Sequence, residues 1–109
     1  MINMLNEEEV ERAVRYLATS ADEYADTKAN MKHLEKFHKS VLAEIALRGT
    51  GNVTSNKLAA EASPKYRECL QEYKDAVAAF TLIEAKRNAA ETWVDVYRTQ
   101  EASKRRGNI

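Results

Sequence analysis

Apolar residues recur at alternating three- and four-residue steps along two long stretches of the chain, which is the spacing of one face of an α-helix. In the first stretch, where Thr27 and Lys28 weaken the pattern, these positions are Val10, Val14, Leu17, Ala21, Tyr24, Met31, Leu34, Phe37 or His38, Val41 and Ile45. In the second stretch they are Tyr66, Cys69 or Leu70, Tyr73, Ala76 or Val77, Phe80, Ile83, Ala90, Val94 or Trp93, and Tyr97, with Arg87 as one interruption. The pattern predicts two long amphipathic helices.

Capping residues and breakers set the expected boundaries of these helices. Asn6 and the three glutamates after it predict that the first helix begins there and runs over about 6–48, because no Gly or Pro precedes Gly49. Residues 49–63 form an elbow in which Thr54 or Ser55 caps a short helix. Ser63 followed by Pro64 starts the second helix, expected over about 64–104, since proline suits the first helical position. Residues 105–109 are left as a basic tail.

The fold class expected from these elements is all-α, a long antiparallel helical hairpin in a single domain, 1–109. Two helices side by side bury one seam, which is less than the shared core of most domains of this length. Apolar residues outside the stripes, such as Leu82 and Val96, widen the apolar surface further. We therefore expect a homo-oligomer, in which coiled-coil packing between copies completes a helical bundle.

Composition narrows the partners and the compartment. Seventeen basic and seventeen acidic residues cancel, so the whole molecule has no field that would attract nucleic acid or an anionic membrane. Cys69 is the only cysteine, the first six residues lack the features of a secretion signal, and no apolar run approaches the roughly 20 residues of a membrane span. These features predict a cytoplasmic protein without a membrane contact.

Two basic clusters are candidates for direct nucleic-acid binding. Lysines three or four residues apart share one helix face near the elbow, and a second cluster places two aromatic rings beside the basic tail. The first cluster is Lys28, Lys32, Lys36 and Lys39, and the second is Trp93, Tyr97, Arg98, Lys104, Arg105 and Arg106. The alternative is that the lysines are the solvated outer face of an amphipathic helix, and that the tail pairs with Glu7, Glu8, Glu9 and Glu11 across the hairpin.

Metal binding and catalysis have weaker patterns. Glu35 and His38 have the Glu-x-x-His spacing of di-iron helical bundles, but a histidine on an apolar stripe is more often a packed side chain. Cys69 as a nucleophile would need a base beside it, and a buried structural thiol is the alternative. The chain has no Gly-rich phosphate loop, nucleophile elbow or paired cysteine ligands. The sequence therefore predicts no catalytic residues, no cofactor and no metal, and a protein that is not an enzyme.

Two segments of the C-terminal half carry a resemblance to a group of known proteins. Residues 62–70, ASPKYRECL, and the stretch from Ala89 to Ser103, which contains AAETWVDVYR, resemble small helical proteins of tailed phages encoded among early or recombination genes. The resemblance implies an accessory protein that acts on DNA recombination or replication machinery through contacts with another protein. It transfers no site residues. The expected function is thus a non-enzymatic helical interaction protein, with direct nucleic-acid binding and a metal-binding dimer as alternatives.

Overall fold

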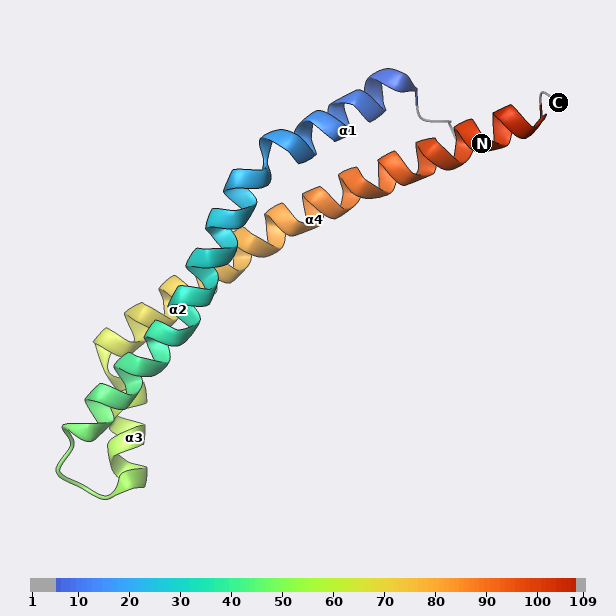
Figure 1. The fold of residues 1–109 in the computed structure, drawn as a ribbon. Helices are drawn as coiled ribbons and strands as arrows, with labels where there is room; N and C mark the ends of the chain where they lie inside the picture. The colour runs from blue at the N-terminus through green and yellow to red at the C-terminus, as the bar shows by residue number, and fades with distance from the viewer. Residues whose placement is uncertain (1–5, 108–109) are drawn as a thin grey trace. The chain divides into compact units, whose positions relative to one another are not determined.

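The computed structural model describes residues 6–107, and residues 1–5 and 108–109, which include most of the N-terminal segment and the end of the predicted tail, lie outside the described residues. The described residues form four helices and no strand: α1 (Glu7–Thr19), α2 (Ala21–Leu47), α3 (Val53–Ala62) and α4 (Pro64–Gly107) (Figure 1). The protein is an all-α helical hairpin, as the sequence predicts. Helix α4 continues to Gly107, so Arg105 and Arg106 are helical rather than part of a separate tail.

The chain divides into two compact units, each built around one helix pair. In unit 1, residues 1–24 and 82–109, α1 runs antiparallel to the C-terminal part of α4 (Figure 1). In unit 2, residues 25–81, α2 runs antiparallel to the N-terminal part of α4, and α3 lies in the connection between them. Each unit therefore has a single apolar seam as its core.

The seam of unit 1 corrects the predicted stripe at two positions. Val14 is 50% exposed and Ala21 is exposed, whereas Ala13 and Ser20, one residue earlier in each case, are buried. Steps of three and four residues counted from Val10 reach Ala13 and Ser20 and keep the seam facing α4. The prediction chose the more apolar neighbour at each step. Ala13 is smaller than Val14 and allows the two helices to approach closely, and Ser20 accepts a hydrogen bond from Arg87 that Ala21 could not accept through its side chain.

The first long helix is also interrupted, so the prediction of one continuous helix over 6–48 was wrong. Helix α1 ends at Thr19, with Ser20 as its C-cap, and α2 begins at Ala21. Arg87 of α4 donates from Nη1 to the carbonyl oxygen of Leu17 at 2.8 Å and to the Ser20 hydroxyl at 2.7 Å. That carbonyl is the one a continuous helix would offer to the N–H of Ala21. A side chain inserted into the helical hydrogen-bond ladder is a recognised cause of such a break.

A polar ring system is part of the seam of unit 2. His38 is buried, and its ring stacks on Tyr73 with a centroid separation of 4.7 Å. The Tyr66 ring is tilted relative to the His38 ring, and their centroids are 6.3 Å apart. The Nδ1 atom is 2.9 Å from the carbonyl oxygen of Leu34, and because a carbonyl only accepts, Nδ1 carries the proton in this contact. His38 rather than Phe37 therefore occupies the seam, and Val41 and Phe80 of the same unit are also buried.

Asparagine side chains organise the elbow. The cap of α3 is Asn52, which accepts from the N–H of Ser55 at 2.8 Å, so the prediction of Thr54 or Ser55 as the cap was wrong by two or three residues. The Asn56 amide closes the loop by bonding both the N–H and the carbonyl of Gly51. A Cβ at position 49 would overlap this amide, which explains the glycine there.

The other two predicted caps are confirmed. Asn6 accepts from the N–H of Glu9 at 2.8 Å at the start of α1, and the Ser63 hydroxyl accepts from the N–H of Tyr66 at 3.2 Å at the start of α4. Both side chains satisfy backbone donors that lack partners in the first turn of a helix.

Candidate protein-interaction surface

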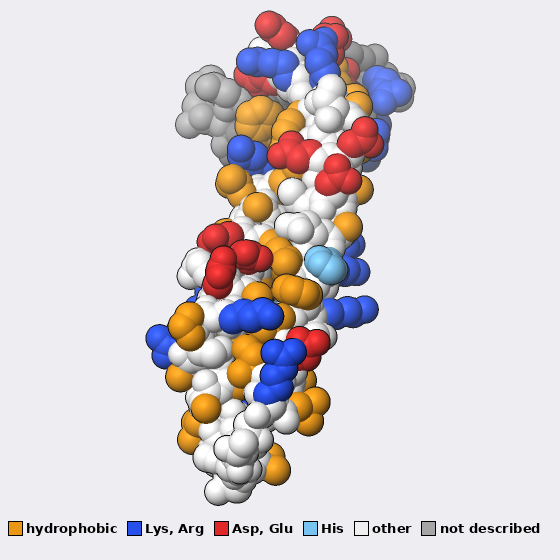
Figure 2. Space-filling model, turned by 90° about the vertical axis from the view of Figure 1, so that its left-hand side faces the viewer, with side chains coloured by type: hydrophobic (Ala, Val, Ile, Leu, Met, Phe, Trp, Pro, Cys, Tyr) orange, Lys and Arg blue, Asp and Glu red, His pale blue; other side chains and the backbone are white. Residues whose placement is uncertain are grey.

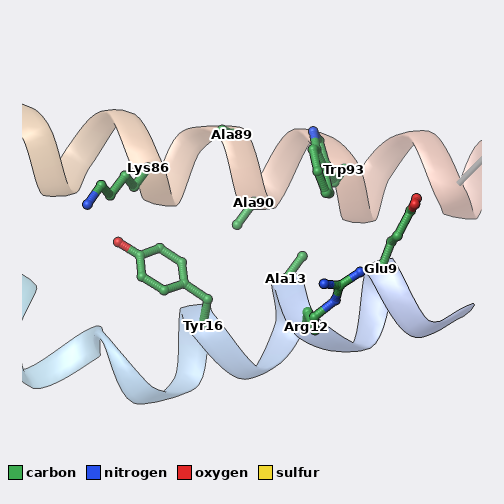
Figure 3. Close-up of a pocket in the computed structure, with 8 residues that line it drawn as sticks. All are labelled: Glu9, Arg12, Ala13, Tyr16, Lys86, Ala89, Ala90 and Trp93. Atoms are coloured by element: carbon green, nitrogen blue, oxygen red, sulfur yellow. The ribbon is translucent and has the colours of Figure 1, made fainter. Parts of the chain in front are cut away.

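A groove lies between α1 and α4 in unit 1 and has a volume of about 470 Å³. Its middle is lined by small side chains, and larger aromatic and charged side chains line its two ends (Figure 3). We call it the Trp93 groove, and its lining residues are Glu9, Arg12, Ala13, Tyr16, Lys86, Ala89, Ala90 and Trp93. It forms because the alanines that bring the two helices together leave space beside the seam.

Trp93 is the largest side chain at this groove, and it is 47% exposed. It lies next to Val94, which faces the seam and is buried in a cluster with Val10, Ala13 and Ala90. A residue adjacent to a seam position points to the flank of a helix pair, because successive residues are about 100° apart. The sequence left Val94 and Trp93 as alternatives, and the structure assigns Val94 to the seam and Trp93 to the groove.

Charged side chains lie at both ends of the Trp93 groove. Figure 3 shows Glu9, Arg12 and Trp93 toward one end, Lys86 and Tyr16 toward the other, and the alanines between them. Sequence reasoning missed Glu9 and Lys86 as groove residues. The signal that could have found them is their place one turn from the small residues Ala13 and Ala90, on the same helix flank.

Unit 2 has its own exposed apolar surface at the elbow. A second groove of about 410 Å³ is lined by Ala43, Ala46, Leu47, Val53 and Asn56. Leu47 is 86% exposed and Val53 is 85% exposed, values that are unusual for two large apolar residues close together. Other exposed large apolar side chains are Val14, Phe37, Leu58, Leu82 and Val96, and Figure 2 shows hydrophobic side chains exposed between groups of charged ones on the face it presents.

The lysine cluster predicted for nucleic acid lies on α2 and is exposed along its length. Lys28, Lys32, Lys36 and Lys39 are all exposed. Lys39 forms an ion pair with Glu35 at 3.8 Å, so part of this charge is compensated within α2. An exposed pair of this kind contributes little to stability, and it leaves both side chains at the surface.

Within the C-terminal cluster, Tyr97 and Trp93 have different surroundings. Tyr97 packs against the buried cluster of unit 1, whereas Trp93 lines the groove. Partial burial raises the pKa of Tyr97, and the nearby carboxylates of Glu101 and Glu7 raise this pKa further, Glu7 also by accepting the phenolic hydrogen bond. Lys104 pairs with Glu101 at 3.5 Å.

The remaining cations of this cluster, Arg98, Arg105 and Arg106, are exposed on α4. For Lys104, the sequence-based alternative of pairing with the glutamates of α1 is replaced by an ion pair with Glu101 within α4, and the Glu7 carboxylate acts on the pKa of Tyr97.

Glu35 and His38, the alternative metal pair, have other contacts in the structure. His38 is committed to Leu34 and Tyr73 in the seam, and Glu35 pairs with Lys39. Among residues 6–107, no group of three or more His, Cys, Asp or Glu side chains is arranged to hold a metal ion. Cys69 is a free thiol, partly buried on α4. None of the helices, over the part of the chain that the structure describes, combines the length and apolarity that a membrane crossing needs.

Comparisons with known proteins add no constraint to this geometry. No protein-family model matches the chain, and neither a curated protein nor a solved structure matches it.

Proposed function

We propose that this chain is a non-enzymatic helical protein that self-associates and acts by binding other proteins through its exposed helix faces. The observation that carries the proposal is the amount of surface left exposed. The chain exposes 8262 Å², whereas a compact monomer of 12.4 kDa exposes about 6,100 Å². The excess is about 2,100 Å².

The chemistry of that surface supports the same proposal. Large apolar side chains remain exposed in both units, including Trp93 in unit 1 and Leu47 and Val53 in unit 2. No large side chain among the described residues is fully buried. A standard interface removes about 800 Å² from each partner, so the excess surface accommodates at least one such contact. The seam polar groups, Arg87 and His38, are occupied by packing contacts and not gathered into a reaction site.

Sedimentation equilibrium over a wide range of protein concentration tests the proposal. The expected result is a mass that rises from 12.4 kDa toward a whole multiple of it. A single monomeric mass at every concentration would show that self-association is wrong.

Direct nucleic-acid binding by the lysine cluster of α2 is a second candidate, favoured by the exposure of all four lysines, Lys28, Lys32, Lys36 and Lys39. Phosphate contacts make affinity fall steeply with salt. A titration of a labelled single-stranded oligonucleotide at low salt should then give saturable binding that Lys32→Glu weakens. Absence of binding at low salt removes this candidate. The link to phage DNA recombination or replication machinery stays a prediction from the resemblance alone.

A further inference from the structure

We infer that the Trp93 groove is the face on which a second copy of this chain docks, with a two-fold axis that crosses the groove perpendicular to the helices. The inference rests on the proposed self-association and specifies where it occurs. Its result is a four-helix arrangement in which α1 and α4 of one copy lie against α1 and α4 of the other, each antiparallel to its equivalent. The second copy is inferred from the shape of the groove and from the surface area that the chain leaves exposed.

The shape of the groove is self-complementary under this axis. The middle is made of Ala13, Ala89 and Ala90, and Trp93 lies toward one end with Tyr16 toward the other (Figure 3). Two-fold docking brings the two alanine surfaces together, where the absence of long side chains allows close helix approach. It also places the Trp93 ring of each copy at the Tyr16 end of the other, where aromatic side chains pack favourably. Because the interface is symmetric, the exposed halves of both Trp93 side chains, one from each copy, are removed from water.

The required area is also within what the chain exposes. A stable interface removes about 800 Å² per copy, and the chain exposes about 2,100 Å² more than a compact monomer.

Trp93 is the only tryptophan of the chain, so its fluorescence reports this groove alone. The experiment measures the mass by sedimentation equilibrium and the emission spectrum of Trp93 over the same dilution series. If a second copy fills the groove, the emission shifts to shorter wavelength with rising concentration, and the shift has the same midpoint as the rise in mass. Trp93→Ala should weaken the dimer by at least about tenfold, as expected for a buried aromatic anchor.

Each outcome decides something different. A rise in mass with unchanged Trp93 emission overturns the groove as the contact and leaves the proposed self-association standing. A monomer at every concentration overturns both. A monomer whose Trp93 emission shifts only when an amphipathic helical peptide is added assigns the groove to another protein and overturns the second copy as its occupant.

Discussion

Replacement of Arg87 by alanine tests whether one side chain holds α1 against α4. The guanidinium donates to the Leu17 carbonyl at 2.8 Å and to the Ser20 hydroxyl at 2.7 Å, and it lies over the Tyr24 ring at 5.0 Å from the centroid. Arg87 and its three partners, Leu17, Ser20 and Tyr24, all belong to unit 1. Ser20 is only 4% exposed, so its hydroxyl has little access to water if the arginine is removed.

The magnitude follows from these contacts. A hydrogen bond with a charged donor contributes roughly 1.5–3 kcal/mol, and a cation–π contact about 0.5–1 kcal/mol when partly exposed. Arg87 is half-buried, so its removal also relieves part of the cost of desolvating a charge. We therefore expect Arg87→Ala to lower the free energy of unfolding by about 2–4 kcal/mol, less than the sum of its contacts. Ser20→Ala should cost about 1–2 kcal/mol, since it loses one bond but gains helix propensity.

Urea unfolding followed by far-ultraviolet circular dichroism measures both changes. All variants are compared at one protein concentration, because self-association makes stability depend on concentration. The double variant completes a cycle, and residues in direct contact should give a coupling energy of about 1 kcal/mol or more. Asn88→Ala is the neighbouring control, because Asn88 is exposed on the same helix and does not line the Trp93 groove.

Two results would refute this reasoning. The first is an Arg87→Ala variant as stable as the original protein, because water would then replace the hydrogen bonds of Arg87 to Leu17 and Ser20 without loss of stability. The second is strict additivity of Arg87→Ala and Ser20→Ala, because the two side chains could not then act through the bond between them.

Phe80→Ala should lower the free energy of unfolding by about 3–4 kcal/mol in thermal or urea unfolding, because this ring is only 9% exposed in a one-seam core. The control Leu82→Ala changes an exposed residue two positions away and should alter this free energy by less than about 0.5 kcal/mol. Equal effects of the two substitutions would mean that the seam is wrongly placed. Asn52→Ala should cost about 1 kcal/mol through loss of the α3 cap; an unchanged midpoint contradicts it. Tyr97 should ionise at a higher pH than an ordinary tyrosine, as measured by the ultraviolet difference from Tyr97→Phe, and Glu7→Gln should lower its pKa. The neutral phenol is the stabilised form, so its contribution is present below the ordinary tyrosine pKa and is lost as pH rises through the raised pKa; a Tyr97 titration unaffected by Glu7→Gln would disprove the contact.

Local signals in the sequence were sufficient for the helices and most of their ends. Asn6 and Ser63 followed by Pro64 were identified as starts, because a capping side chain acts within three residues of its own position. The failure at α3 has the same origin. Asn52, Thr54 and Ser55 are all competent caps, and the choice among them depends on how the Asn56 amide closes the loop at Gly51.

The surroundings of Trp93 and Tyr97 could not be predicted from the sequence. Both aromatic residues are visible there, but which of them packs against α1 depends on how α4 meets α1. The structure places Tyr97 against α1 and Trp93 at the groove. The two residues are only one helical turn apart, but one packs against the buried cluster of unit 1 and the other lines the groove.

The sequence by itself determined an all-α hairpin with one apolar stripe on each long segment, because hydrophobic periodicity and capping are properties of a single chain segment. Only the tertiary structure decided the register of the stripe at Ala13 and Ser20, the break that Arg87 makes beside Ser20, and the groove that has Glu9 toward one end and Lys86 toward the other. Each of these depends on a residue about seventy positions away along the chain, and a contact between two segments has no signature in either segment alone. For this reason Arg87 looked like a flaw in the pattern of α4 and is instead the side chain that joins it to α1.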